Sequence, residues 1–367
     1  RLESLTYVGA PPMRLLALVA AVAVVRPAFA AVIVLANQTD EEVAFTLGVA
    51  GTTAGAGIGV VAPNEARVFP VGRQPEIALT LDGKAVRYQL APYTAYVVAK
   101  GAGGATTFAG VETAAAMPPA DDVPAAPPKW EGKYKLPIKI LADDADPRTR
   151  EKWEKGVRER VAAASAVLER ACGVALDVVA ADEWASKADA GALADLLADF
   201  EGKVPPAPGR VALGVTSRKL PRRPDGTGNA GCTRGPLSTH VLVREAAPPS
   251  EPERVEVLIH EIGHVLGAAH APDPNGLSVM RGRFGDGWAA GAKFKVRFDP
   301  LNLLAMGVWV EQLRGGKLTR WSDLSPPAAA RLKVIYQTLR KANPDDPLAD
   351  SYLANLGDPG VTAKPPD

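Results

Sequence analysis

Three of the chain's four histidines fall within eleven residues, HEIGHVLGAAH. If this stretch is helical, His260 and His264 lie one turn apart, so their imidazoles project from one face and can hold one zinc ion. Glu261 is one step round the helix, a position that suits a general base better than a metal ligand. Gly267 lets the chain leave the helix, and His270 can then return as the third ligand. Three protein ligands leave a fourth position open, as a catalytic zinc site requires.

The full spacing H-E-x-x-H-x-x-G-x-x-H is far more informative than a bare H-E-x-x-H. It fixes five residues, so a chance match in one chain is on the order of 1 in 10⁴ at average residue frequencies. The alternative, in which the helical histidines serve only as polar residues, is therefore the weaker interpretation. A competing nucleophile motif such as G-x-S-x-G does not occur in the sequence.

The elements around the motif must position its side chains. Ser250 is followed three residues later by Glu253, which forms a capping box at the start of a helix. Apolar residues then recur at helical spacing, which predicts one buried face. They are Val255, Leu258, Ile259, Ile262, Val265 and Leu266.

The region before the motif reads as a strand, a long helix and further strands. Residues 136–143, LPIKILAD, alternate as a strand, and Asp146-Pro147 predicts an N-cap with proline at the first helical position. Gly173 is expected to end this helix. Its predicted buried stripe comprises Trp153, Val157, Val161, Ala164, Leu168 and Cys172. The later runs ALDVVAA, RVALGVTS and STHVLVRE are strand candidates, so we expect an α+β domain, a mixed twisted sheet with long helices.

Residues 31–113 alternate short β-rich runs with turn residues and contain no catalytic constellation. Asp82-Gly83 lies between two runs and predicts a type I′ hairpin, because both turn positions need positive φ. The pattern predicts a small antiparallel all-β sandwich or barrel. We expect a packing or prodomain-like module rather than a specific binding module. Residues 114–134 are rich in proline and alanine and predict a linker.

The C-terminal part predicts supporting helices. Asp299-Pro300 begins one helix, which Gly315 ends, and Ser325-Pro326 begins another. We expect these helices to pack under the domain that spans residues 135–343. Residues 344–367 are rich in proline and aspartate, so we expect a mobile tail.

The N-terminus indicates export. An apolar run after Met13 ends in Ala28-Phe29-Ala30, the pattern of a signal peptide, residues 13–30, cleaved before Ala31. Residues 1–12 are expected to be an upstream extension. An uncleaved anchor is the alternative, but the run of eleven apolar residues falls short of a membrane span. We expect a secreted protein, extracellular or periplasmic and cell-envelope, without stable membrane insertion after cleavage.

Composition limits the partners. The chain has 367 residues, 47% hydrophobic and 23% charged, which fits two globular domains. Its formal charge of +1 gives no electrostatic footprint for nucleic acid. We therefore expect no nucleic-acid partner, and the partner must be identified from a site.

The chain has two cysteines, Cys172 and Cys232. In an oxidising compartment an even pair is most simply one disulfide. Two unpaired thiols are the next alternative. In the last alternative, Cys232, within NAGCTRG, is a thiolate that caps the metal and keeps the protein latent.

The motif, followed ten positions later by Met280 in NGLSVMRG, resembles the metzincin clan of zinc endopeptidases, and most closely its secreted matrixin-type members, including bacterial relatives. The resemblance covers about residues 135–343 and rests chiefly on residues 250–282. Three departures leave the subfamily open: Ala271 follows the third histidine, no tyrosine follows the methionine, and nothing matches the matrixin cysteine-switch peptide.

This resemblance implies one zinc ion held by His260, His264 and His270, with Glu261 as general base and Met280 in a turn that floors the metal site. It also implies an edge strand, STHVLVRE, along which an extended peptide substrate aligns by β-augmentation. The strand residues are Thr239, His240, Val241, Leu242 and Val243. A plain sheet edge is the alternative, and we interpret the histidine on this strand as structural.

We therefore expect a secreted zinc-dependent endopeptidase acting on a protein or peptide substrate through a zinc-activated water and Glu261. One rival function is a secreted binding or adhesion protein with an inactive metal site. Retention of Glu261 argues against it, because zinc binding alone would not need this residue. The other rival is a zinc amidase acting on a cell-wall polymer, and an edge strand favours extended peptide instead.

Overall fold

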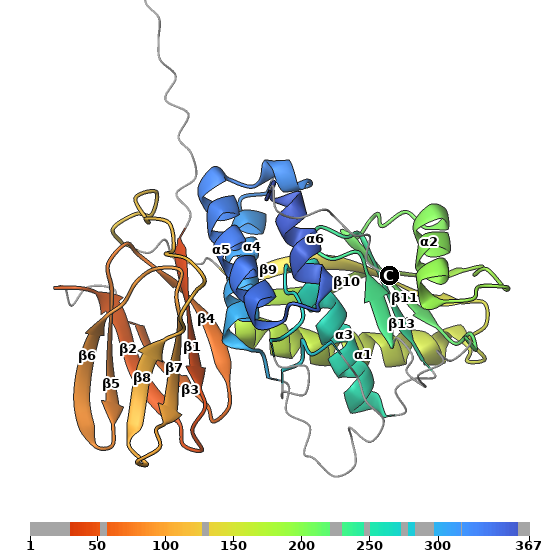
Figure 1. The fold of residues 1–367 in the computed structure, drawn as a ribbon. Helices are drawn as coiled ribbons and strands as arrows, with labels where there is room; N and C mark the ends of the chain where they lie inside the picture. The colour runs from red at the N-terminus through yellow and green to blue at the C-terminus, as the bar shows by residue number, and fades with distance from the viewer. Residues whose placement is uncertain are drawn as a thin grey trace, which may run out of the picture.

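The computed structural model describes residues 30–51, 57–126, 132–220, 230–245, 250–272, 278–282, 297–316 and 318–358. They form an N-terminal β region, a central mixed sheet with helices on both faces, and a group of C-terminal helices (Figure 1). The predicted α+β fold class is confirmed. The predicted upstream extension and signal peptide, apart from Ala30, lie outside the described residues. No helix within the described residues combines the length and the apolar character needed to cross a membrane.

Two four-stranded sheets face each other in the β region, with strand orders β4-β1-β7-β8 and β3-β2-β5-β6 (Figure 1). The strands are β1 (Ala31–Asn37), β2 (Val43–Val49), β3 (Gly57–Val61), β4 (Ala66–Val71), β5 (Pro75–Leu81), β6 (Lys84–Gln89), β7 (Ala95–Lys100) and β8 (Thr106–Gly110). Asp82 and Gly83 have φ of 47° and 77° and form the predicted hairpin turn between β5 and β6. One departure is that β1 and β7 pair in parallel, because the chain passes through the other sheet between them.

The central sheet has five strands in the order β10-β9-β11-β13-β12, all parallel except β12. The strands are β9 (Tyr134–Asp143), β10 (Val174–Trp184), β11 (Val211–Thr216), β12 (Gly231–Thr233) and β13 (His240–Arg244). Helices α1 (Arg150–Cys172) and α3 (Glu251–Val265) contact each other and the sheet, while α2 (Leu193–Lys203) packs in a separate apolar cluster. The sheet therefore has apolar cores on both faces, as predominantly parallel strands require.

Helix α1 confirms the predicted stripe, since all six of its predicted residues are buried. Gly173 ends the helix in the left-handed conformation, with φ of 71°. The predicted start was wrong: the N-cap is Thr149, not Asp146. The Asp146 carboxylate instead accepts from the Arg148 backbone at 2.9 Å and pairs with its guanidinium, which makes a turn before the helix.

Helix α3 begins as predicted after Ser250, whose backbone N–H donates to Glu253 Oε2 at 3.0 Å. Every residue from Val255 to Val265 is buried. This stretch of the helix has no face exposed to solvent, so it packs against other parts of the protein on every side. The motif therefore lies in the interior of the molecule.

The C-terminal helices are α4 (Pro300–Arg314), the short 3₁₀ helix η1 (Trp321–Asp323), α5 (Pro326–Ala342) and α6 (Pro347–Asn355). The predicted caps are confirmed: Asp299 accepts from Asn302 N at 3.0 Å, and Ser325 caps α5. The expected mobile tail is wrong over the stretch that forms α6. There Asp346 caps the helix, and Tyr352 is 1% exposed.

Helix α4 joins the β region to the rest of the molecule, because it contacts β1, β4 and β7 on one side and α1 and α5 on the other (Figure 1). A Cβ added at Gly307 would lie 2.9 Å from Val68 and 3.3 Å from Val32, so only glycine allows this close approach. Ala30 N also donates to the buried carboxylate of Glu311 at 3.1 Å. The β region thus shares one apolar core with the central domain.

The predicted linker is attached to its surroundings along its described part. Ala114 N donates to Thr338 Oγ1 on α5 at 2.9 Å. The carboxylate of Asp122 pairs with Arg331, and Arg73 donates to the Asp121 carbonyl. These contacts fix residues between the β region and the central sheet, while the domain boundaries stay predictions.

Candidate metal centre

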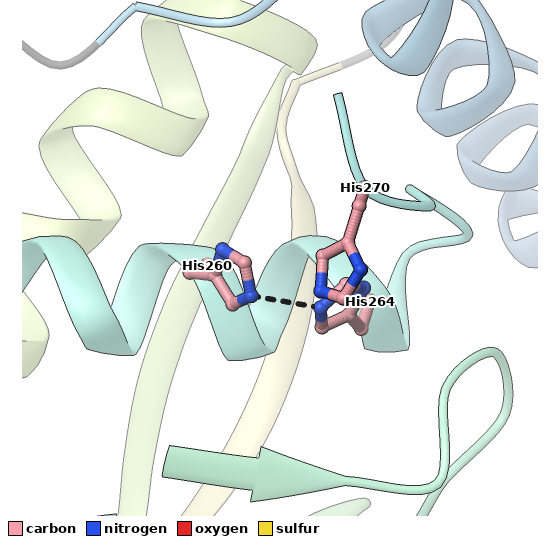
Figure 2. A group of neighbouring side chains, drawn as sticks. All are labelled: His260, His264 and His270. Atoms are coloured by element: carbon pink, nitrogen blue, oxygen red, sulfur yellow. Dashed lines mark hydrogen bonds between the residues drawn. The ribbon is translucent and has the colours of Figure 1, made fainter. Parts of the chain in front are cut away.

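The structure brings the three motif histidines together at one point. His260 and His264 project from α3, and His270 comes from the segment that follows it (Figure 2). The Nε2 atoms of the first two lie 2.9 Å apart, and one ring nitrogen from each histidine lies within 4.8 Å of the others. Among the described residues, this is the only group of His, Cys, Asp and Glu side chains arranged to hold a metal ion.

Hydrogen bonds at the outer ring nitrogens assign the tautomers of these histidines. The Nδ1 atoms of His260 and His264 lie 2.8 Å from the carbonyls of Val279 and Ala268. A carbonyl can only accept, so each Nδ1 carries the proton and each Nε2 presents a lone pair. Two facing lone pairs at 2.9 Å repel unless a cation lies between them. The donor set therefore fits a metal ion, and neutral imidazoles are the preferred ligands of zinc.

The buried setting also favours neutral histidines. Burial, reinforced by the neighbouring imidazoles, lowers the pKa of His260 well below its ordinary value and that of His264 to about 3. Protons therefore do not compete with a metal ion near neutral pH.

Glu261, which follows His260 in α3, is buried at 4% exposure. Burial raises the pKa of its carboxyl to about 8. A Cβ added at Gly231, on β12, would lie only 2.7 Å from Glu261 Oε1. The absence of a side chain at Gly231 therefore makes room for the carboxylate between α3 and the sheet edge.

Met280 packs against α3 at Gly263. A Cβ added at Gly263 would be 2.6 Å from Met280 Sδ. The Met280 carbonyl accepts from Ala271 N at 2.7 Å, which ties its turn to the third histidine's segment. In the same turn, Arg281 donates to the buried carboxylate of Glu256 on α3 at 3.0 Å. Burial, opposed by the charge of Arg281, raises the pKa of Glu256 to about 8.

Gly267 makes the predicted turn out of α3. Its φ is 94°, and a Cβ there would lie 1.9 Å from the Trp309 ring. Trp309 Nε1 donates to Tyr336 Oη at 2.8 Å, and this hydroxyl donates to the Gly267 carbonyl at 2.7 Å. The turn therefore needs glycine both for its backbone conformation and for its contact with α4.

Side chains from the C-terminal helices hold the rest of the segment that carries the third histidine. Asn302 Oδ1 accepts from Ala269 N at 2.7 Å, and Asp346 Oδ1 accepts from His270 Nδ1 at 2.9 Å. Neither Asn302 nor Asp346 was predicted from the sequence. For Asp346 a signal was present, because Asp346-Pro347 repeats the cap pattern of Asp299-Pro300.

The predicted substrate edge strand is wrong in its position. β13, which contains His240, Val241, Leu242 and Val243, pairs with β11 on one side and β12 on the other, and the Thr239 carbonyl accepts from Ala212 N. The short strand β12 forms the edge of the sheet on this side within the described residues. His240 is structural as interpreted: its Nε2 lies 2.8 Å from the Val204 carbonyl, and its ring packs edge-on against Phe200.

The predicted disulfide is also wrong, because Cys172 and Cys232 are free. Cys172 ends α1 just before β10, whereas Cys232 lies on β12, and these strands form opposite edges of the sheet. The thiol of Cys232 lies against the Leu193 carbonyl of α2, at 3.7 Å, and packs with the apolar cluster on that side. It does not belong to the histidine centre.

No protein-family model matches the chain, and no curated protein matches it. One similar solved structure is the archaemetzincin of Methanopyrus kandleri, with 20% identity, coverage of 48% of this chain and 96% of that chain, and a TM-score of 0.36. Another is a chaperone–substrate complex, with 14% identity, coverage of 60% and 45%, and a TM-score of 0.37. Structural similarity with TM-scores this low supports no inference about function. The functional interpretation therefore rests on the histidine centre.

Proposed function

We propose that this protein is a zinc-dependent endopeptidase of the metzincin type. The observation that supports this proposal is the convergence of three imidazoles, those of His260, His264 and His270, with Glu261 buried next to His260 in α3. Three nitrogen ligands are a set that zinc accepts, and they leave one position for water or substrate. A purely structural zinc site would have four protein ligands and no need of a neighbouring acid.

In this proposal the three histidines hold one zinc ion through Nε2 atoms. The bound ion would polarise the scissile carbonyl and lower the pKa of the attacking water to about 7. In its ionised form, Glu261 would accept a proton from this water at a carboxylate oxygen and then deliver it to the nitrogen of the leaving amine. Its burial beside Gly231 keeps it away from bulk solvent.

The edge strand supports a protein or peptide as the substrate. β12 pairs with β13 on one side only within the described residues, and its Gly231 contacts Glu261. An extended peptide that adds to this edge would run past the base and the histidines. We also propose that the chain is exported, since its N-terminal sequence has the pattern of a signal peptide.

The test is hydrolysis of an unfolded protein by the zinc-loaded chain, with Glu261→Gln beside it. We expect cleavage by the parent, inhibition by a chelator and recovery with zinc. Glu261→Gln should keep one zinc ion while its rate falls by about 10²–10⁴, the usual contribution of a general base. Glu251→Gln, on the exposed start of the same helix, should retain activity.

Two results would contradict the proposal. Zinc binding with equal, negligible cleavage by parent and variant would indicate a binding protein with an inactive metal site. Hydrolysis of amides in a cell-wall polymer, with no cleavage of proteins or peptides, would indicate a zinc amidase.

A further inference from the structure

The third histidine is held by a carboxylate from a distant helix. Asp346 Oδ1 accepts from His270 Nδ1 at 2.9 Å, and Asp346 Oδ2 accepts from the His270 backbone N–H at 3.3 Å. The Asp346 side chain is 5% exposed, whereas that of His270 is 23% exposed. One buried carboxylate therefore fixes both the backbone and the ring of the most exposed histidine of the centre.

Helix α6, which begins after Asp346, is attached to the centre at a second point. Tyr352 Oη donates to the Ala268 carbonyl at 3.3 Å, and the same carbonyl accepts from His264 Nδ1. Tyr352 is 1% exposed and also contacts Gly235, in the segment after β12. Because α6 is held at both places, the position of the Asp346 carboxylate is fixed relative to α3.

We propose that Asp346 is a positioning residue for the metal centre. By accepting from Nδ1, it holds His270 in the tautomer that leaves Nε2 free, and it turns that nitrogen toward the two helical histidines. Carboxylates that orient ligating histidines in this way raise metal affinity. The inference rests on the proposed function, because it takes His270 to be a zinc ligand.

A competing account is that Asp346 serves only to begin α6. Its Oδ1 also accepts from Leu348 N at 3.3 Å, as an N-cap does. The substitution Asp346→Ser separates the two roles, because serine is an equally good N-cap but is too short to hold the imidazole. Asp346→Asn keeps both the cap and a neutral acceptor, so it removes only the charge. Asp350→Asn is the matched control, since Asp350 lies on the same helix and pairs with Arg340 instead.

The experiment measures zinc affinity of the full chain by competition with a chromophoric chelator, together with the visible spectrum of the cobalt(II)-substituted protein. We expect Asp346→Ser to weaken zinc binding by about 10–100-fold and Asp346→Asn by a smaller factor. The cobalt(II) spectrum of Asp346→Ser should change, since His270 is no longer held. Asp350→Asn should bind zinc as the parent does, and the metal-free Asp346→Ser protein should unfold at nearly the parent's temperature.

The inference is overturned if both Asp346 variants bind zinc within about twofold of Asp350→Asn and give the parent's cobalt(II) spectrum. If Asp346→Ser does not fold, the affinity of Asp346→Asn decides by the same criterion. His270→Ala gives the affinity of a centre without its third ligand. A parent chain that binds no zinc would refute the proposed function itself, which distinguishes the two failures.

Discussion

His260 and His264 are four residues apart on one helix, whereas His270 lies beyond the end of α3 and contacts Asp346, 76 positions away. The geometry of the helical pair follows from the 3.6-residue repeat alone, because residues i and i+4 share one face. The third histidine has no such local rule. Its position depends on a glycine turn and on side chains from α4, α5 and α6.

The difference shows how a short motif can be recognisable while the site it forms depends on much of the chain. The outer nitrogens of His260 and His264 donate to backbone carbonyls, which most sequences would supply. The outer nitrogen of His270 donates to a side-chain carboxylate. Substitutions in the helical pair, before Gly267, and in the segment of His270, after it, should therefore have different consequences.

The largest expected effect is removal of a ligand from the helical pair. Structural zinc sites bind with about 10–16 kcal/mol, so one ligand in four accounts for roughly 3 kcal/mol, or about 100-fold in affinity. His264→Ala should weaken zinc binding by at least this factor without unfolding α3, which is buried from Val255 to Val265. Chelator competition measures the affinity, and circular dichroism the helix content. Unchanged affinity would show that the pair does not ligate zinc.

A substitution at the turn between the two kinds of ligand should destabilise the whole fold. Gly267→Ala places a Cβ at φ of 94° and 1.9 Å from Trp309, which should lower the free energy of unfolding by about 3 kcal/mol or more. Gly316→Ala is the control, because Gly316 has φ of 85° but nothing within 4 Å of its added Cβ. Its cost should be about 1 kcal/mol. Urea unfolding measures both, and equal costs would mean that contact with α4 does not hold the turn.

Asn302→Ala tests the support of the turn from α4. It removes the acceptor for Ala269 N in a fully buried position, which should cost about 1–3 kcal/mol of unfolding free energy. Because Asn302 does not touch the helical pair's outer nitrogens, the Co(II) spectrum should change less than with His264→Ala. A larger change in the Co(II) spectrum than that of His264→Ala would contradict the distinction between the helical pair and the segment of the third histidine.

The last prediction concerns pH dependence at the link between α3 and the methionine turn. Burial raises the pKa of Glu256 to about 8, so the folded state retains a proton that the unfolded state releases above about pH 4.5. This group therefore makes the protein less stable as the pH rises from about 5 to 8, by at most about 1.4 kcal/mol per pH unit. Glu256→Gln should make this decline shallower in metal-free protein, as urea unfolding at several pH values would show. An equal or steeper decline would contradict the assignment.

The sequence predicted those features that local rules control. Ser250 and Glu253 marked the start of α3, the stripe from Trp153 to Cys172 marked α1, and Asp82-Gly83 marked a hairpin. Each depends on spacing within a few turns or on a single backbone conformation. The same rules predicted that His260 and His264 share one helix face and that Gly267 makes a turn after them.

Features that depend on tertiary pairing were not predicted. β12 has three residues, GCT, which is too short to show a two-residue period, so its place outside β13 could not be read from the sequence. Whether Cys172 and Cys232 meet depends on which strands form the two sheet edges. α6 was missed because its prolines and aspartates dominated the composition, although Asp346-Pro347 is a cap signal.

The most direct test of the central claim, that three histidines hold one zinc ion at an open site, is zinc K-edge X-ray absorption on the purified chain loaded with zinc. The claim predicts one zinc ion per chain, imidazole scattering from three histidines at about 2.0–2.1 Å, and at least one further light ligand that is not from the protein. Loss of one imidazole in His270→Ala would identify the third ligand. A sulfur ligand, or fewer than three imidazoles in the parent, would contradict the claim.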